Sequence, residues 1–207
     1  MKAIRATAMM VGLLVAAASG IAHANLIKNG TFDLDLSEWD QAGTIGTFWD
    51  EPSQTAHLGR PGKDGTSIFS QDFQIPSGND HLKIWFDYQW QVNAPSTPDM
   101  FTVELAYNST GGTVTELLLS ESSAPPAAFG STMSFHAQIA LVDLLVSDPN
   151  ATLRFTLEET VNSPNSSGSR IQLDNISVKV PAPASIALLA VGLLGAGYSR
   201  KRRRTVN

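Results

Sequence analysis

A regular alternation of apolar and polar residues in the middle of the chain restricts its fold more than any other feature. Apolar residues occupy every second position of residues 84–92, and mostly polar residues lie between them. The same pattern recurs in residues 101–107, 133–141 and 153–157. Turn-forming stretches separate these segments at residues 60–65, 93–98, 108–112 and 163–168. A period of two is typical of half-buried strands, so the sequence predicts an all-β sandwich, with a helical turn over residues 141–147.

The last predicted strand changes phase partway along its length. Ile171 and Leu173 share one phase, whereas Ile176 and Val178 share the opposite one. One extra residue in the strand, a β-bulge, would turn both apolar pairs toward the same core. We therefore expect a bulge that changes the direction of the Asp174 side chain.

The first 24 residues have the three parts of a secretory signal peptide. Lys2 and Arg5 give it a positive start, and residues 6–18 are apolar. Ala22 and Ala24 are small residues with the spacing of a cleavage site. We expect the Sec export machinery to translocate the chain and cleavage to follow Ala24. The alternative is an uncleaved membrane anchor, which would export the same domain.

The other end of the chain carries a short apolar segment between prolines and a basic cluster. As a helix, residues 183–198 would extend about 24 Å, whereas the hydrocarbon core of a bilayer is about 30 Å thick. The basic residues that follow would stay on the cytoplasmic side. The sequence therefore predicts three parts: a signal peptide (1–24), a β-sandwich domain (25–179), and a C-terminal segment with a short transmembrane helix (180–207).

The C-terminal segment resembles the PEP-CTERM sorting signal of Gram-negative bacteria. The resemblance rests on a proline motif, a short helix rich in Leu, Ala and Gly, and a basic cluster, in that order. The matching residues are Val180, Pro181, Ala182, Pro183, Arg200, Lys201, Arg202, Arg203 and Arg204. In that family an exosortase cuts near the proline motif, in species that make exopolysaccharide and a biofilm matrix.

The resemblance implies a protein that is anchored transiently in the inner membrane and then reaches the cell surface or the extracellular matrix. Ala182 departs from the family, which usually has Glu at this position. A plain membrane anchor without processing is the alternative.

The predicted domain is acidic and lacks cysteine. Residues 25–180 hold 7 basic and 19 acidic groups, a formal charge of 7 − 19 = −12. An acidic surface repels phosphate backbones, which excludes nucleic acid as a favoured partner. The absence of cysteine excludes disulfides, thiolate metal sites and thiol nucleophiles. Cations and neutral ligands are the expected partners.

Three stretches of this domain resemble the jelly roll of galactose-binding-like domains and carbohydrate-binding modules. They are residues 25–33 with Trp39, residues 69–73 and residues 171–176. In that family an acidic residue near the start and an aspartate in the final strand often share a structural calcium ion. Asp33 and Asp174 occupy those positions, so the resemblance implies a Ca²⁺ site between them. The alternative is that Asp174 caps the bulge and Asp33 is solvated.

One tryptophan is placed to bind a sugar. Trp85 stands on the polar side of its strand with Asp87 and Gln89. An exposed indole ring stacks on the apolar face of a sugar, while carboxylates and amides bind its hydroxyl groups. Tyr88 and Trp90 fall on the apolar side and are predicted to be core residues, as is Trp39. The alternative for Trp85 is burial at a contact between sheets.

No catalytic motif is recognisable in the chain. It has no His-Glu-x-x-His pair, Gly-x-Ser-x-Gly elbow or phosphate-binding loop. The adjacent carboxylates at 50–51 and 158–159 cannot flank one bond, and we predict a solvated surface for them. The sequence predicts a non-catalytic exported protein that binds exopolysaccharide. The alternatives are a permanently anchored structural protein and a small secreted glycan-active enzyme.

Overall fold

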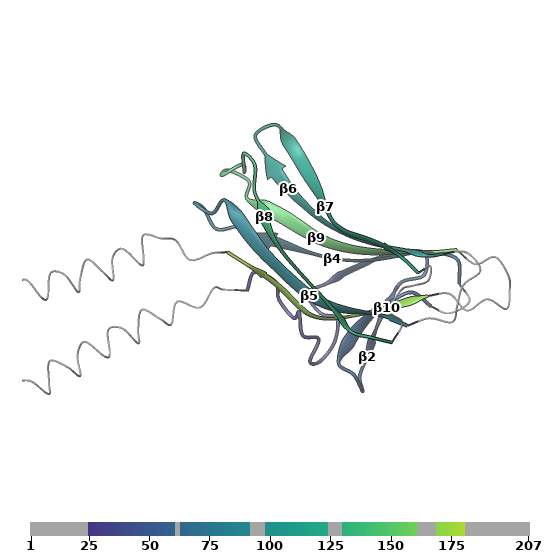
Figure 1. Cartoon of the computed structure of the whole chain (residues 1–207). Coiled ribbons are helices and arrows are strands. Elements are labelled where there is room, and N and C mark those ends of the chain that lie inside the picture. The colour runs from purple at the N-terminus through teal and green to yellow at the C-terminus, as the bar shows by residue number, and fades with distance from the viewer. Residues whose placement is uncertain (1–24, 61–62, 92–97, 124–129, 161–168, 181–207) are drawn as a thin grey trace, which may run out of the picture. The chain divides into compact units, whose positions relative to one another are not determined.

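The computed structural model describes residues 25–60, 63–91, 98–123, 130–160 and 169–180, which form ten β-strands in two sheets (Figure 1). All strand pairs are antiparallel, and none of these residues is helical. The predicted all-β sandwich is confirmed. The predicted helical turn at 141–147 is wrong, because this stretch forms turns around an isolated bridge between Leu144 and Ser109.

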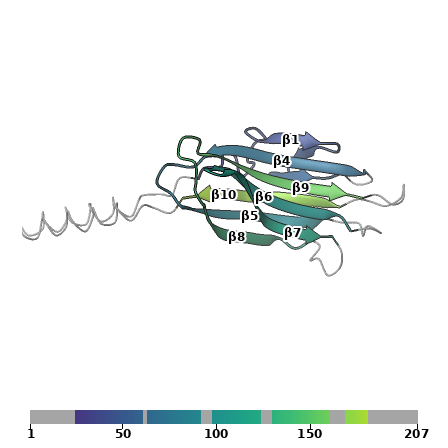
Figure 2. The ribbon, with the colours of Figure 1, turned by 90° about the horizontal axis from the view of Figure 1, so that it is seen from above.

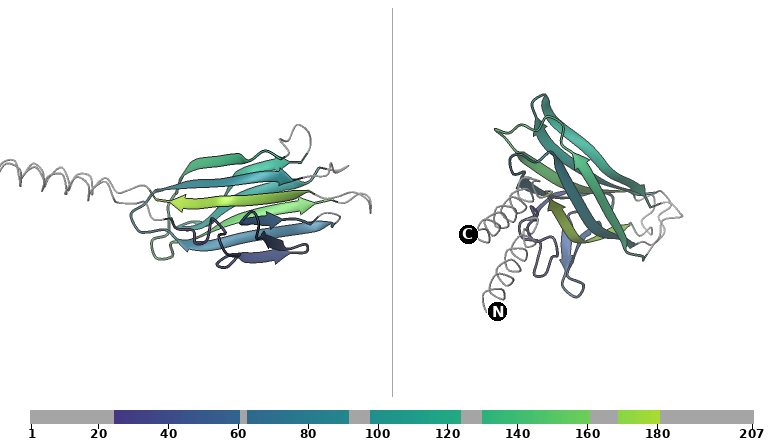
Figure 3. Two further views of the ribbon diagram at one scale, coloured as in Figure 1. Left: turned by 90° about the horizontal axis from the view of Figure 1, so that it is seen from below. Right: turned by 60° about the vertical axis from the view of Figure 1, so that its left-hand side comes forward.

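Each sheet has five strands. The first has the order β1-β4-β9-β6-β7 and the second the order β2-β3-β10-β5-β8. The strands are β1 (Asp40–Gly43), β2 (Thr47–Asp50), β3 (Thr55–Leu58), β4 (Gly65–Gln74), β5 (His81–Gln91), β6 (Met100–Ser109), β7 (Gly112–Ser122), β8 (Met133–Ala140), β9 (Asn150–Glu159) and β10 (Arg170–Lys179). Figure 2 shows the sandwich from above, and the left panel of Figure 3 shows β10 at the centre of the second sheet.

The core lies between the sheets and consists of the apolar residues that alternate along the long strands. Phe86 of β5 packs edge-on against Phe155 of β9, with 5.2 Å between ring centroids. Trp39 stacks on Phe69 at 4.4 Å, and Trp90 is fully buried. The core assignments of Trp39, Tyr88 and Trp90 are confirmed by their burial.

The segment that precedes β1 lies along β10. The main-chain nitrogen of Leu26 donates to the carbonyl of Val178 at 2.7 Å, and that of Ile176 donates to the carbonyl of Gly30 at 2.9 Å. The approach is so close that a Cβ atom at Gly30 would lie 2.0 Å from the Ile176 oxygen. The chain therefore needs glycine at position 30 to dock its N-terminal segment on the last strand.

The predicted β-bulge in β10 is confirmed. Asp174 pairs with Asp87 of β5, the next pair joins Ser177 and Trp85, and the register shifts between them. Asn175 adopts a left-handed backbone with φ of 53°. Apolar side chains on both sides of the bulge are buried, as the phase change in the sequence requires.

The predicted targeting segments lie outside the described residues. They include the signal peptide with Ala22 and Ala24, and the C-terminal segment from Pro181 onward. Within the ranges given above, no helix has the length and apolar character needed to cross a membrane. Residues Asn25–Val180 form one compact unit.

Candidate functional site

The outward side chains of β2, β3, β10 and β5 form one surface, which we call the polar face. On β5 it carries Trp85, Asp87 and Gln89, because every second residue points away from the core. The register of β10 places Gln172 beside Gln89, and Asp174 beside Asp87. The structure therefore brings four residues singled out in the sequence, Trp85, Asp87, Gln89 and Asp174, onto one face of the sandwich.

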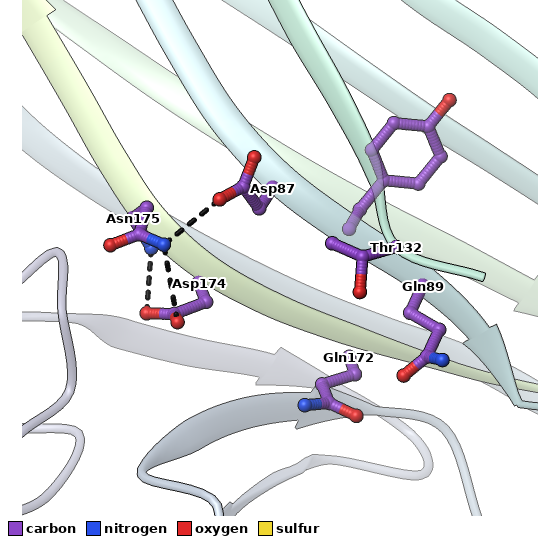
Figure 4. A pocket seen from close by; sticks show the side chains of 7 residues that line it. Asp87, Gln89, Thr132, Gln172, Asp174 and Asn175 are labelled. Carbon is purple, nitrogen blue, oxygen red and sulfur yellow. Dashed lines mark hydrogen bonds between the residues drawn. The ribbon is translucent and has the colours of Figure 1, made fainter. Parts of the chain in front are cut away.

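A shallow hollow of about 130 Å³ opens in the middle of the polar face (Figure 4). Its lining residues are Asp87, Tyr88, Gln89, Thr132, Gln172, Asp174 and Asn175. The Asp87 carboxylate accepts hydrogen bonds from Ser134 Oγ at 2.5 Å and from Asn175 Nδ2 at 2.9 Å. The Gln89 amide donates to the Gly130 carbonyl. These bonds fix the side chains, so the hollow presents polar groups in set positions.

Asp174 stands in an environment that disfavours its charge. Burial raises the pKa of the Asp174 carboxyl, and repulsion from Asp87 and Asp33 raises it further. The main-chain N–H of Asn175, which donates to Asp174 at 2.7 Å, acts in the opposite direction. A positive ion, or a hydroxyl group that donates a hydrogen bond, would be stabilised beside this carboxylate.

Asp33 lies in the exposed loop after the N-terminal segment. Its carboxylate accepts a hydrogen bond from Thr31 Oγ1 at 3.0 Å, and its carbonyl accepts one from Gln54 Nε2 at 3.0 Å. Its charge acts on Asp174, and both groups offer the oxygen ligands that calcium prefers. In the described part of the chain, no three acidic or histidine side chains form a group that could hold a metal. A calcium ion between Asp33 and Asp174 would need main-chain or water oxygens as its other ligands.

Trp85 lies on the polar face but does not line the hollow. Its side chain is half-buried, and the Lys179 ammonium lies 5.4 Å from the centroid of its ring. This cation occupies a face of the indole through its attraction to the π-electrons. A sugar that stacked on this face would have to displace Lys179.

A second aromatic group on the polar face was missed by the sequence analysis. Phe48 of β2 stacks on His57 of β3 at 4.8 Å, and the Arg170 guanidinium lies 4.9 Å from the Phe48 ring centroid. His57 pairs in register with Gln172, which accepts a hydrogen bond from Gln91 Nε2. The group was missed because β2 and β3 have only four residues each, too few for a period-two pattern to stand out.

Within this group, His57 is the buried member. Its Nε2 lies 3.0 Å from Thr55 Oγ1, and its Nδ1 is buried without a partner. Burial lowers the pKa of His57 to about 4, with a further contribution from the positive charge of Arg170. The imidazole is therefore neutral near pH 7 and acts as a packing surface for Phe48.

The described domain has the jelly-roll β-sandwich fold of carbohydrate-binding modules. It is similar to TmCBM61, a carbohydrate-binding module solved with β-1,4-galactotriose, with a TM-score of 0.50 and 12% identity over 76% of this chain and 99% of that chain. It is also similar, with a TM-score of 0.50 and 14% identity, to the enzymatically active domain of tailspike protein 4 from bacteriophage CBA120. That match covers 76% of this chain and 21% of the tailspike chain, so this protein spans about a fifth of its length.

The C-terminal segment is identified by sequence. Residues 179–204 match the PEP-CTERM protein-sorting motif, which confirms the resemblance seen in the prolines, the apolar run and the basic cluster. The motif marks a secreted protein that is membrane-anchored before exosortase processing. No curated protein matches the sequence.

Proposed function

We propose that this protein is exported, processed by an exosortase-type enzyme, and displayed outside the cell, where its sandwich binds polysaccharide without cleaving it. The observation that carries the proposal is the hollow in the polar face, where amide and carboxylate groups from neighbouring strands converge. The fold, which this chain shares with a module solved with a galactose oligomer, supports a glycan ligand. The sorting motif at 179–204 supports a location outside the inner membrane.

The groups available to a sugar are those that no protein group satisfies. Within the described ranges, Gln172 Nε2, Gln89 Oε1 and Thr132 Oγ1 have no hydrogen-bond partner, although all three residues line the hollow. A donor, an acceptor and a hydroxyl together match the mixed donor and acceptor character of sugar hydroxyls. Asp87 has protein donors on both oxygens and positions Asn175.

The glycan proposal is tested by binding of the secreted protein to exopolysaccharide of its host and to β-1,4-galactan. Replacing Gln89 and Gln172 by alanine together should weaken binding about tenfold or more, because two or more hydrogen bonds are lost. Gln138→Ala is the matched control, since Gln138 is exposed on β8 outside the hollow. Unchanged affinity in the double variant would exclude the hollow as the site, and failure of the wild type to bind either glycan would overturn the proposal.

The processing step is tested by the mass and terminal peptides of the protein recovered from the medium and from the cell envelope. We expect a secreted chain that starts at residue 25 and ends near residues 181–183. A chain that still ends at Asn207 and stays in the membrane would contradict exosortase processing and favour a permanent anchor.

We further propose that Asp33 and Asp174 bind the calcium ion that the jelly-roll resemblance implies. Support comes from their oxygen donors and from the repulsion that raises the pKa of Asp174, which a cation would relieve. Asp174→Asn should weaken calcium binding at this site at least tenfold in isothermal titration. Asp72→Asn, on the outer face of the first sheet, is the control. Equal affinity in Asp174→Asn and wild type would exclude the site.

A further inference from the structure

In the described part of the chain, the two sheets end in four edge strands, β1 and β7 in the first sheet and β2 and β8 in the second. Three of these edges carry a feature that opposes pairing with another strand. β1 and β2 have only four residues each. β7 has a register shift opposite Val103 and Glu104, and its Glu116 and Glu121 lie opposite buried residues of β6, so both carboxylates point inward. Short strands, bulges and inward charges are the usual protection of a sheet edge.

The fourth edge strand, β8, has none of these features. It is eight residues long and pairs with β5 in unbroken register from Met133 to Ala140. It contains no proline and no Asp, Glu, Lys or Arg. Figure 2 shows β8 along one side of the sandwich, and no described strand pairs with its outer edge. This edge therefore presents main-chain N–H and C=O groups to an incoming strand, with no charge or bulge to turn it away.

The inward side chains of β8 are incompletely covered. Met133, Phe135, Ala137 and Ile139 are half-buried, whereas every inward residue of the neighbouring β5 is buried. Phe135 stacks on Phe86 of β5, with 4.7 Å between ring centroids, so its contact with the core is on the side of β5. A strand added beyond β8 would extend the core over these apolar residues and remove them from water.

The outward side chains of β8 suit a second copy of the same strand. His136 and Gln138 are exposed, and each has donor and acceptor atoms, so each is able to bond to its own copy or to the other. The domain has a formal charge of −12, which opposes association of two copies. Because β8 has no charged residue, pairing with its own copy sets no like charges of the strand opposite one another.

We propose that β8 pairs antiparallel with β8 of a second copy of this chain, which joins the second sheets of the two copies into one continuous sheet. Outward residues alternate with a period of two, so a symmetric pair with its outward residues on one side places one residue opposite its own copy. The fullest overlap of the strands puts either His136 or Ala137 at that position. The two-fold axis is perpendicular to the joined sheet, and the two polar faces therefore look the same way.

This arrangement has a consequence for binding that rests on the proposed glycan function. Two hollows on one continuous surface would bind repeated units of a single polysaccharide chain. Linking two sites raises the apparent affinity for a polymer without any new contact at either site. The pairing of the strands itself does not depend on a glycan.

The first experiment measures the mass of the protein in solution by sedimentation equilibrium. The protein is purified from the medium or, with detergent, from the envelope. At about 100 µM, where an interface with a micromolar Kd is largely occupied, we expect about twice the mass of one chain. His136→Glu with Gln138→Glu should restore the single mass, because like charges then face one another across the joined strands.

The matched control is His136→Thr with Gln138→Thr, which keeps the strand neutral and should keep the doubled mass. Circular dichroism checks that both double variants are folded. A wild-type protein with the mass of one chain at this concentration would overturn the proposal. A doubled mass that survives in the folded glutamate variant would also overturn it, because the copies would then meet elsewhere.

Cross-linking gives a second readout that does not depend on the glutamate variant. The chain has no cysteine, so a single introduced cysteine reports only its own position. In either central register, the two copies of residue 136 lie directly or diagonally opposite, at about 5 to 8 Å. A short bismaleimide should therefore link two copies of His136→Cys. The control is Gln74→Cys, on the exposed face of β4 in the first sheet, which should stay unlinked. No link in His136→Cys, or equal linking in both variants, would overturn the pairing.

The effect on affinity is tested with a short and a long ligand. The glutamate variant should bind β-1,4-galactotriose as the wild type does but bind β-1,4-galactan about tenfold more weakly, because only the polymer reaches two hollows. Equal galactan binding by both proteins would overturn the gain from two linked sites. If the wild type bound neither ligand, the glycan proposal would fail, and the mass and cross-linking results would still decide the pairing.

Discussion

The two outer faces of the sandwich follow the same alternation but carry different side chains. On the first sheet, β9 presents Thr152, Arg154 and Thr156, which are short or solvated groups. Thr152 Oγ1 donates to Asp72 at 2.5 Å, and Arg154 lies 3.9 Å from Glu104. These contacts are isolated polar pairs, and the same face also carries the exposed Leu117 of β7.

On the second sheet, one row across the strands holds Phe48, His57, Gln172 and Gln89. Here long amides and stacked rings cover one another, and His57 is buried although it points away from the core. The comparison teaches that alternation identifies the outward residues but not their role. Length, stacking and mutual cover of the outward side chains distinguish the polar face from the solvated outer face of the first sheet.

The largest expected effect comes from the N-terminal segment, which lies along β10 of the second sheet and also forms hydrogen bonds with Gln71 of β4 in the first sheet. In Gly30→Ala, the new methyl group would lie 2.0 Å from the Ile176 carbonyl oxygen, so the main chain has to move. We expect the free energy of unfolding to fall by about 3 kcal/mol, as for severe overpacking. Denaturant unfolding measures the change, and glycan binding should weaken with it.

Gly111→Ala is the control for this substitution. A Cβ atom there would meet only Ser109 Oγ at 3.8 Å, an ordinary contact, so the expected loss is below about 1 kcal/mol. Equal losses in the two variants would show that docking of the N-terminal segment does not shape the second sheet.

The next largest effect concerns His57, a buried histidine on the outer face of the second sheet. Among the described residues, the outer face of the first sheet has no such histidine. The folded pKa of His57 is about 4, below its ordinary value of 6.5, so the unfolded chain binds the proton more tightly. The contribution of the neutral His57 side chain to folding stability is therefore fully present above pH 6.5. It is lost as the pH falls from 6.5 toward 4. We expect the stability difference between wild type and His57→Asn to shrink by about 2 kcal/mol between pH 7 and pH 4.5.

Chemical denaturation of both proteins across this pH range measures the difference. Arg170 and Asp50, the charged groups that act on His57, are present in both, so their own contributions largely cancel. If the stability difference between the two proteins stayed constant with pH, Phe48 and Arg170, which cover His57, would not hold its imidazole neutral.

Much of the fold could be predicted from the sequence because the long strands obey a simple period. Residues 84–90, 101–107 and 153–157 alternate over enough positions to fix which side faces the core. The bulge could also be predicted, since the phase change between Leu173 and Ile176 has no other solution in one strand. Local rules work where one strand carries the whole signal.

The rest depends on contacts between strands that are distant in the sequence. Phe48, His57 and Arg170 come from three strands, two of them short, and no local pattern brings them together. The sequence did carry a signal that Glu159 is buried, because Glu159 continues the inward phase of Leu157. Its charge, however, favoured the prediction of a solvated position, which is wrong. The rule that charges lie outside fails where several segments converge on a buried carboxylate.

The smallest expected effect is on the first sheet, and it makes the comparison of the two faces quantitative. Arg154 Nη1 lies 3.9 Å from Glu104 Oε2, and both side chains are partly exposed, so their attraction is weakened by water and salt. Arg154→Ala should cost less than about 1 kcal/mol and leave glycan binding unchanged. Glu104→Ala should give a similar small loss of stability, and the two changes should be nearly additive at high salt.

If instead Arg154→Ala weakened glycan binding as strongly as the double change at Gln89 and Gln172, the first sheet would also contact the ligand. Solvation of the outward side chains would then no longer distinguish the two faces, and the glycan would have to reach both.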